Sequence, residues 1–329
     1  MKIAFTICSN NFLAQAKAMF DSLLLHNPDL KTFLFLADQR DGSIEYETVI
    51  AAETIVITEE IVPQYADVVK RYSVGELNSA VRPFIFQYIS KLYPGAKRLY
   101  YLDSDLCFYN SVQQLDEWLN NNDILITPHF LTPVPMDGHT PFENLALNYG
   151  TYNLGFLALN PQTENTKQFL IWWGERTACY SHIDLANGYF TDQIWFNLVS
   201  LFFRKVHVIE HPGYNMACWN LHERYIAAYN AGGTILLSSG DPLVFYHFSL
   251  WDHSSPKKLT RDFTRFNFDN RQDMARLYEE YYVSLQQNGV DTYSKIPCQL
   301  NYRKPPKPGA VKKLLTPGIR AARNIWNKL

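Results

Sequence analysis

The sequence contains few cysteines, and none of them form a recognisable pair. The 329 residues include five scattered cysteines without a Cys-x-x-Cys spacing. A zinc site or a disulfide framework is therefore not expected, and a reducing compartment is the simplest inference. Long apolar runs are also missing, because no stretch reaches the roughly 18 residues of a transmembrane helix. The apolar start at residues 1–8 is too short for a signal peptide and is typical of a first strand.

Two further absences narrow the possible partners. No Gly-x-Gly-x-x-Gly follows the first predicted strand, so a dinucleotide cofactor is not indicated. Residues 301–329 hold eight basic residues and no Asp or Glu. Without these eight, the 30 basic residues fall to 22 against 32 acidic ones, so residues 1–300 carry a net charge of −10. An acidic body of this kind repels nucleic acid, which is not expected as a partner.

The remaining composition is that of a globular protein. Hydrophobic residues make up 47% of the chain and charged residues 19%, which fits one large domain or two closely packed ones. Aromatic residues reach 15%. Such an excess occurs where proteins stack on sugars, but a large core favours the same residues and is the simpler interpretation.

Apolar runs and helical periodicities alternate along the chain. A strand–helix–strand opening with strands buried on both faces predicts an α/β, Rossmann-like and mostly parallel sheet flanked by helices. Four prolines make residues 128–145 a long loop or lid, and Pro83 is expected to start or kink a helix. Strands are predicted at residues 1–8, 32–37, 55–57, 98–102, 123–127, 151–159, 206–209 and 243–247, and helices at residues 12–24, 75–92, 163–178 and 190–203.

Two carboxylates follow the strand at residues 98–102. Asp103 and Asp105 are separated by Ser104, and the segment reads Leu-Tyr-Tyr-Leu-Asp-Ser-Asp. Ligands of open α/β sheets bind at the carboxyl ends of strands, so the position suits a site. Adjacent carboxylates repel each other and favour a bound cation, and Mg²⁺ or Mn²⁺ accepts carboxylate oxygen together with substrate phosphates. The alternative is a carboxylate pair that caps the next helix.

This segment resembles the metal motif of GT-A glycosyltransferases, particularly those similar to family 8. Three later segments agree with that family in order and spacing, and the resemblance as a whole covers roughly residues 1–265. They are Tyr-Asn-Leu-Gly-Phe-Leu-Ala-Leu-Asn at 152–160, Phe-Thr-Asp-Gln at 190–193 and Tyr-His-Phe-Ser at 246–249. The run His-Pro-Gly-Tyr-Asn at 211–215, followed by Trp219 and Asn220, is similar to a bacterial subgroup of unassigned glycosyltransferases.

The resemblance implies a role for each matching residue. It implies a metal held by Asp103, Asp105 and His247, and catalytic residues Asp192 and Gln193. The implied nucleotide-binding residues are Thr6, Cys8, Asn10, Asp38, Ser104 and Lys257. The implied donor-sugar residues are Arg82, Asn153, Gly155, Asp192 and Gln193, and the acceptor residues are Asn215, Trp219 and Asn220.

The resemblance also implies a reaction. A sugar would move from a nucleotide-diphosphate sugar, by family habit a UDP-sugar, to a glycan or lipid-linked acceptor in cell-surface polysaccharide or lipopolysaccharide synthesis. Retention of the anomeric configuration is implied, while an inverting enzyme would need a carboxylate base such as Asp192 or Asp252. The sequence departs from the family at Ser249, where the family has Gly, and its phosphate-binding Lys is displaced to Lys257.

The chain divides into three predicted parts. Residues 1–265 form the GT-A domain, with a nucleotide part at 1–127 and a sugar and acceptor part at 128–265. Residues 266–300 form a helical extension. Residues 301–329 interleave basic and apolar residues, which favours an anionic membrane surface. We therefore expect a cytoplasmic protein, peripheral on the inner face of the cytoplasmic membrane, although a disordered solubilising tail has the same composition.

Two other classes of protein use similar residues. Haloacid-dehalogenase-type phosphatases carry Asp-x-Asp at a strand end, with the first Asp as nucleophile. In that class the pair follows the first strand, whereas about 100 residues precede it here. An inactive sugar-binding module is the second alternative. Neither the donor sugar, the linkage nor the oligomeric state follows from the sequence.

Overall fold

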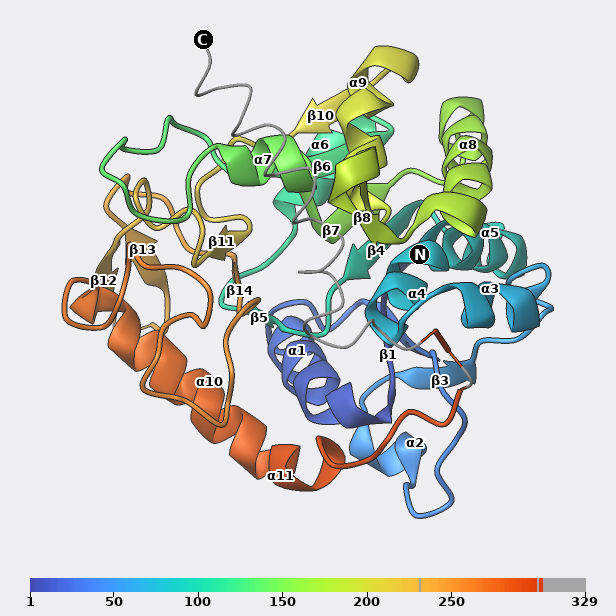
Figure 1. Cartoon of the computed structure of the whole chain (residues 1–329), viewed down its shortest axis with the longest axis horizontal. Coiled ribbons are helices and arrows are strands. Elements are labelled where there is room, and N and C mark those ends of the chain that lie inside the picture. The colour runs from blue at the N-terminus through green and yellow to red at the C-terminus, as the bar shows by residue number, and fades with distance from the viewer. Residues whose placement is uncertain (231, 301, 304–329) are drawn as a thin grey trace, which may run out of the picture.

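The computed structural model describes residues 1–230, 232–300, 302 and 303. Its centre is a seven-stranded sheet with the strand order β10-β6-β7-β4-β1-β2-β3 (Figure 1). All neighbouring pairs are parallel except those of β7, which is antiparallel to both β4 and β6. The strands are β1 (Lys2–Cys8), β2 (Lys31–Leu36), β3 (Glu53–Val56), β4 (Arg98–Leu102), β6 (Ile124–Pro128), β7 (Tyr152–Leu159) and β10 (Val206–Val208). The predicted mostly parallel α/β sheet is confirmed.

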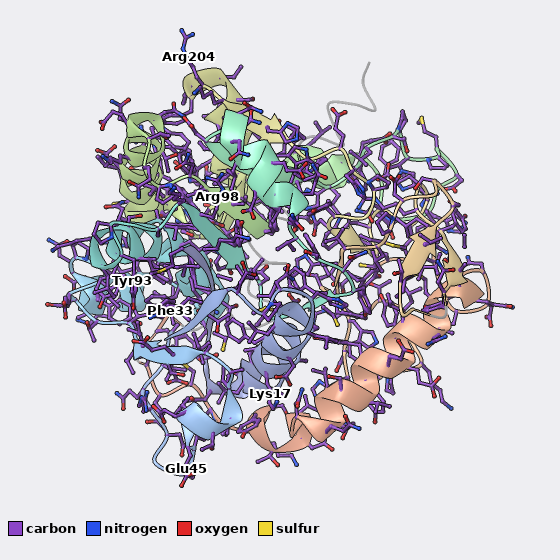
Figure 2. The ribbon with its side chains drawn as sticks, turned by 180° about the vertical axis from the view of Figure 1, so that it is seen from behind. Lys17, Phe33, Glu45, Tyr93, Arg98 and Arg204 are labelled. Atoms are coloured by element: carbon purple, nitrogen blue, oxygen red, sulfur yellow. The ribbon has the colours of Figure 1, made fainter. Side chains whose placement is uncertain are left out.

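Helices cover both faces of the sheet, because successive strand residues point to opposite sides. Ile3 and Phe5 of β1 enter the core on one face, whereas Ala4 enters the core on the other. The first face is covered by α3 (Tyr65–Arg71), α4 (Val74–Ala80), α5 (Arg82–Leu92) and α8 (Glu164–Tyr180), and the second by α1 (Leu13–His26), α2 (Tyr46–Val49) and α6 (Gln114–Asn121). Figure 2, seen from behind, shows Phe33 and Tyr93 on the first face, with ring centroids 5.5 Å apart.

A second, three-stranded sheet continues the chain beyond β4. It consists of β5 (Leu106–Phe108), β14 (Phe245–His247) and β11 (Met216–Ala217), with β14 in the middle. A third core joins this sheet to α1 and to the helices of the C-terminal extension, α10 (Ala275–Gln287) and α11 (Val290–Tyr293). Figure 1 shows both helices along the lower edge of the molecule, beside α1.

Two predicted helices differ from the structure. The helix expected at residues 75–92 is split at Val81 into α4 and α5, because Pro83 begins a new helix at its first turn. Residues 190–203 do not form the single helix that was expected. Phe190 ends β9 (Tyr189–Phe190), and η3 (Gln193–Leu198) and α9 (Val199–Phe202) follow it. Thr191 has a φ of 47°, which no α-helix contains, and it turns the chain between these elements.

The remaining elements are short and peripheral. The predicted loop at residues 128–145 is irregular up to α7 (Asn144–Tyr149). The others are β8 (Ile183–Asp184), β12 (Ile226–Tyr229), β13 (Ile235–Leu237), η1 (Asn10–Phe12), η2 (Leu185–Asn187) and η4 (Gln272–Met274).

The predicted basic tail lies largely outside the described residues. Of residues 301–329, the structure describes Tyr302 and Arg303, and both lie against the body of the protein. The backbone N–H of Arg303 donates to the carbonyl of Tyr72 at 2.8 Å. Within the part of the chain that the structure describes, no helix combines the length and the apolar character that a membrane crossing requires.

Candidate active site

The three predicted metal ligands come together where the two sheets meet. Strand β4 ends at Leu102, and the turn after it leads into β5, which pairs antiparallel with β14. That register places His247 opposite Leu106, next to Asp105. The Nε2 atom of His247 lies 3.0 Å from Oδ1 of Asp105 and 3.7 Å from Oδ2 of Asp103. A residue nearly 150 positions away in the sequence thus completes the carboxylate pair.

The ring of His247 is held by its other nitrogen. Nδ1 lies 3.3 Å from Oδ1 of Asn215, whose Nδ2 donates to Oδ1 of Asn153 at 3.3 Å. With Nδ1 as the donor, Nε2 is free to face the carboxylates. Orientation of an imidazole by a hydrogen bond to its second nitrogen is the usual arrangement at metal sites. Asn215 is wholly buried and lines neither of the cavities described below, so it positions His247 and does not face a ligand.

Gly155 gives the imidazole room. A Cβ on this residue would lie 2.3 Å from Cε1 and 2.7 Å from Nδ1 of His247, so no other residue fits without moving the ring. The carbonyl of Gly155 also accepts a hydrogen bond from the backbone N–H of Asp103 at 2.8 Å. Gly155, which was predicted to bind the donor sugar, therefore supports two of the three proposed metal ligands, His247 and Asp103.

The cluster fits a divalent cation. One ligand atom from each of Asp103, Asp105 and His247 can be chosen so that all three lie within 4.8 Å of one another. Burial raises the pKa of Asp105, but His247 outweighs this and leaves it below its ordinary value. Burial acts to lower the pKa of His247, but the carboxylates of Asp105 and Asp103 outweigh burial and leave that pKa above its ordinary value. Two carboxylates and an imidazole suit Mn²⁺ or Mg²⁺.

Arg82, at the start of α5, joins the cluster to Asp192. Its Nη2 lies 3.0 Å from Oδ1 of Asp103, and its Nη1 lies 3.1 Å from Oδ2 of Asp192 and from the carbonyl oxygen of Leu154. The guanidinium stacks on the ring of Tyr101 at 4.3 Å, and the Tyr101 hydroxyl donates to Asp103. Burial raises the pKa of the wholly buried Asp192 to about 6, and Arg82 opposes this rise.

The side chain of Gln193 is engaged with backbone. Its Oε1 accepts from the N–H of Leu154 at 3.0 Å, and its Nε2 donates to the carbonyl of Tyr149 at 2.8 Å. These bonds tie the turn at Thr191 to strand β7 and so fix Asp192 beside Arg82. The predicted Asp192–Gln193 pair therefore forms one connected unit with the metal ligands.

Two cavities meet at this cluster, and both are lined by Arg82 and Asp103. The Trp219 cavity has a volume of about 590 Å³, and the Cys8 cavity about 600 Å³. The Trp219 cavity is also lined by His129, Phe142, Asn153, Gly155, Phe190, Asp192, Gln193, Trp219, His247 and Asp262. The Cys8 cavity is also lined by Cys8, Asn78, Tyr101, Ser104, Asp105, Lys295, Pro297, Cys298 and Tyr302.

The predicted nucleotide-binding residues divide into two groups. Cys8 and Ser104 line the Cys8 cavity. Thr6, Asn10 and Asp38 are buried beneath it, with exposed fractions of 0%, 0% and 1%. These three residues are components of the wall.

The Asn10–Asp38 contact fixes that wall. Nδ2 of Asn10 donates to Oδ2 of Asp38 at 3.0 Å, and Oδ1 of Asp38 accepts from the backbone N–H of Gln299 at 2.8 Å. Residues 294–300, together with Tyr302, thus close one side of the Cys8 cavity. Sequence reasoning missed this segment, because nothing in its composition indicates which strand ends it reaches. Lys257 is exposed and lines neither cavity.

The predicted acceptor residues have different surroundings. Trp219 lines its cavity, and its ring lies 5.3 Å from that of His247. Asn220 is wholly buried, and its Nδ2 donates to the carbonyls of His129 at 3.2 Å and Asn215 at 3.0 Å. With its amide occupied in this way, Asn220 supports the site from behind.

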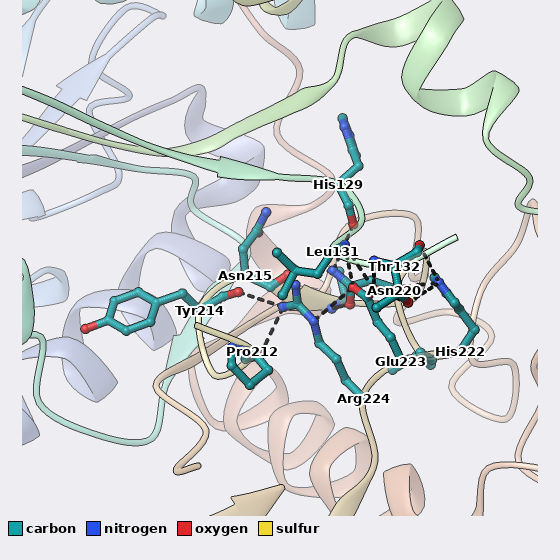
Figure 3. A network of polar contacts seen from close by, with 12 residues as sticks. His129, Leu131, Thr132, Pro212, Tyr214, Asn215, Asn220, His222, Glu223 and Arg224 are labelled. Atoms are coloured by element: carbon teal, nitrogen blue, oxygen red, sulfur yellow. Dashed lines mark hydrogen bonds and ion pairs between the residues drawn. The ribbon is translucent and has the colours of Figure 1, made fainter. Parts of the chain in front are cut away.

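A buried polar network extends this support (Figure 3). The carboxylate of Glu223 accepts from the backbone N–H groups of Leu131 at 2.9 Å and Thr132 at 2.6 Å. Arg224 donates to the carbonyls of Pro212 at 3.0 Å and Tyr214 at 2.7 Å. The loops that carry His129 and Asn215 are therefore tied together.

His129 is a site residue to which the sequence assigned no role. It follows β6 directly, and it lines the Trp219 cavity. Burial lowers its pKa to about 4, so the ring is neutral at pH 7. Its Nδ1 lies 3.4 Å from the carbonyl of Thr151, and its Nε2 lies 3.5 Å from Nδ2 of Asn153. Its place after a strand end was the available signal.

No family model matches the sequence. Two uncharacterized proteins of Bacillus subtilis (strain 168) are similar to it. YfnF is 26% identical over 245 residues, which cover 74% of this chain and 80% of YfnF. YfnD is 23% identical over 288 residues, which cover 85% of this chain and 88% of YfnD.

Solved structures show which fold this is. The galactosyltransferase LgtC, in complex with donor and acceptor sugar analogs, superposes with a TM-score of 0.53 at 14% identity, over 86% of this chain and 96% of LgtC. The apo structure of WbbM, a bifunctional glycosyltransferase, gives a TM-score of 0.50 at 12% identity, over 88% of this chain and 50% of WbbM. The chain has the GT-A type fold of these proteins, as the motifs predicted.

Proposed function

We propose that this protein is a metal-dependent glycosyltransferase that moves a sugar from a nucleotide-diphosphate sugar to a glycan or lipid-linked acceptor. One observation carries the proposal. The cluster of Asp103, Asp105 and His247 lies where two cavities of about 590 and 600 Å³ meet. A donor with its diphosphate at the cluster would place its nucleoside in one cavity and its sugar in the other. The fold shared with LgtC, whose structure holds donor and acceptor sugar analogs, supports this arrangement.

The reaction breaks the bond between the anomeric carbon and a diphosphate oxygen, and the electron pair leaves with the diphosphate. An acceptor hydroxyl oxygen bonds to the anomeric carbon, and its proton passes to the departing diphosphate oxygen. A divalent cation held by Asp103, Asp105 and His247 would supply charge for the leaving group. Asp192, fixed by Arg82, would bind sugar hydroxyls and orient the donor. Trp219 and the aromatic rings of Phe142 and Phe190 would face the sugars.

Retention of the anomeric configuration is the proposed outcome. The wholly buried Asp192 is paired with Arg82, so it is poorly placed to act as a general base for inversion. Asp252, the other candidate base, lines neither cavity and accepts hydrogen bonds from Ser254. NMR of the fresh product's linkage tests this, and an inverted product would contradict it.

The carboxylate pair gives the direct test of the proposed activity. Asp103→Asn and Asp105→Asn should each abolish transfer from a panel of nucleotide sugars with Mn²⁺, while circular dichroism stays that of the wild type. Asp21→Asn is the matched control, because Asp21 forms an exposed ion pair with Lys17 on α1. Full activity of both site variants in excess EDTA would end the case for metal dependence. Release of phosphate from monoesters would favour a phosphatase, and sugar binding without turnover an inactive module.

The same proposal includes a nucleobase, a pathway and a location. The nucleobase is uridine, the pathway is cell-surface polysaccharide or lipopolysaccharide synthesis, and the location is the inner face of the cytoplasmic membrane. Their support is the set of sequence motifs and the basic residues after Arg303. Each basic residue near an anionic surface contributes about 1 kcal/mol. Binding of the full chain to anionic vesicles, compared with a chain ending at Arg303, tests the membrane part. Equal binding of the two would remove it.

A further inference from the structure

The Cys8 cavity contains two basic side chains, and they are in different situations. Arg82 is engaged with Asp103 and Asp192, so its charge is already matched. Lys295 lines the same cavity, and it forms no ion pair with any residue that the structure describes. The other charged groups of that lining are the carboxylates of Asp103 and Asp105. Lys295 is therefore the cation of this cavity that is available to an anionic ligand.

The backbone around Lys295 is held on both sides. Lys295 lies within the turn that follows α11, in which the N–H of Ile296 donates to the carbonyl of Tyr293 at 2.9 Å. Further along, the N–H of Gln299 donates to Asp38 at 2.8 Å, and Arg303 pairs with Glu76 at 2.6 Å. Lys295 is thus placed at the cavity by a segment that is anchored on both sides.

With a diphosphate bound, the cluster would carry negative charge that a divalent cation alone does not neutralise. A nucleoside diphosphate carries at least two negative charges, and Asp103 and Asp105 add two more. A divalent cation cancels two of the four. Arg82 contributes little net charge, since Asp192 lies beside it. A further cation near the diphosphate would stabilise both the bound donor and the leaving group.

We propose that Lys295 binds the diphosphate of the donor, in the role that the sequence resemblance gave to Lys257. The inference rests on the proposed function, because it needs a diphosphate at the Asp103–Asp105–His247 cluster. Lys257 and Lys258 are exposed and line neither cavity, whereas Lys295 lines the cavity that contains both carboxylates. Lysine commonly contacts phosphate as a compact point charge.

Calorimetry on the full chain tests the proposal. Wild-type protein is first titrated with UDP, dTDP, GDP and ADP in Mn²⁺, and the tightest diphosphate is carried forward with its free nucleoside. Lys295→Met should weaken the diphosphate about tenfold or more, since hydrogen bonds to charged groups contribute about 1.5–3 kcal/mol. The nucleoside should bind to both proteins equally. Lys295→Arg should recover most of the affinity, and Lys258→Met, on another exposed lysine, should bind like the wild type.

The outcomes separate the two claims. Loss of diphosphate affinity with unchanged nucleoside affinity and an unchanged melting temperature supports a direct charge contact. Equal diphosphate binding by Lys295→Met and the wild type overturns the role of Lys295 but leaves the proposed function standing. A loss in Lys257→Met in place of Lys295→Met also overturns it. A wild-type protein that binds none of the four diphosphates overturns both claims.

Discussion

The Trp219 cavity and the Cys8 cavity share Arg82 and Asp103, but their walls are held in different ways. In the Trp219 cavity, Asp192 and Gln193 are buried and bonded within the protein. The Cys8 cavity is closed on one side by residues 294–300 and Tyr302, and Lys295 there is exposed. Few polar contacts fix this side, among them Gln299 to Asp38 and Arg303 to Glu76.

This difference in how the two walls are held indicates that the two cavities differ in rigidity. Buried, fully bonded polar groups are rigid and hold their geometry. The side on which bonds would break is therefore fixed in advance, as preorganised catalysis requires. A segment held by few contacts opens at a smaller free-energy cost than the core does. We therefore expect the Cys8 cavity to be the one that opens to admit and release a ligand.

The largest predicted effect comes from a substitution in the wall of the Trp219 cavity. Arg82→Met removes the partner of the wholly buried Asp192, and an unpaired buried charge costs about 3–5 kcal/mol. Urea denaturation should show a loss of that order in the free energy of unfolding. The double variant Arg82→Met/Asp192→Asn should regain part of it, because the wholly buried charge at residue 192 is then removed as well.

An exposed ion pair provides the contrast for this experiment. Arg276 pairs with Glu280 at 2.7 Å on the surface of α10. Arg276→Met should change the free energy of unfolding by less than about 1 kcal/mol. If Arg82→Met cost no more than Arg276→Met, the claim that the Trp219 side is fixed by its buried charges would be wrong.

The second prediction concerns the space beside His247. Gly155→Ala would place a Cβ 2.3 Å from the imidazole, so the ring must turn away from Asp105. Mn²⁺ affinity, measured by the electron paramagnetic resonance of free Mn²⁺, should fall about 10- to 100-fold, as for the loss of an orienting partner. The control is Gly174→Ala in α8, where the nearest atom would lie 3.4 Å away. Unchanged Mn²⁺ binding by the Gly155 variant would remove His247 from the metal set.

The sequence predicted the sheet and the carboxylate pair because both depend on local patterns. Apolar runs identified the strands, and Asp103 and Asp105 directly follow one of them. His247 was reached through a family motif, since its pairing with Asp105 depends on the register of β5 and β14. Long-range register of this kind leaves no trace in local periodicity.

Other parts of the site could not be predicted in this way. The roles of Asn215 and Asn220 depend on which buried groups they contact, and no local pattern indicates that their amides face inward. Lys295 reaches the Cys8 cavity because residues 294–300 cross the carboxyl ends of β1 and β2. A lysine in a polar segment looks like any solvated charge until the chain path is known.

The smallest predicted effect concerns the segment that closes the Cys8 cavity, and it depends on pH. Burial raises the pKa of Glu76, but the N–H groups of Ser73 and Ile183 and the guanidinium of Arg303 outweigh this and leave it below its ordinary value. A carboxyl with a lowered folded-state pKa stabilises the fold above its unfolded-state pKa. That contribution is lost as the pH falls through the folded-state value.

Arg303→Met separates this local contact from the stability of the whole chain. Because the Arg303 side chain is 43% exposed, its removal should cost less than about 1 kcal/mol of global stability. Hydrogen exchange of residues 294–300 should nevertheless speed up at pH 7, while exchange in β7 stays that of the wild type. The gap between variant and wild type in residues 294–300 should narrow as acid protonates Glu76. Equal acceleration in β7 and in residues 294–300 would mean that the two cavities open together, and the contrast between a fixed and an opening side would then be wrong.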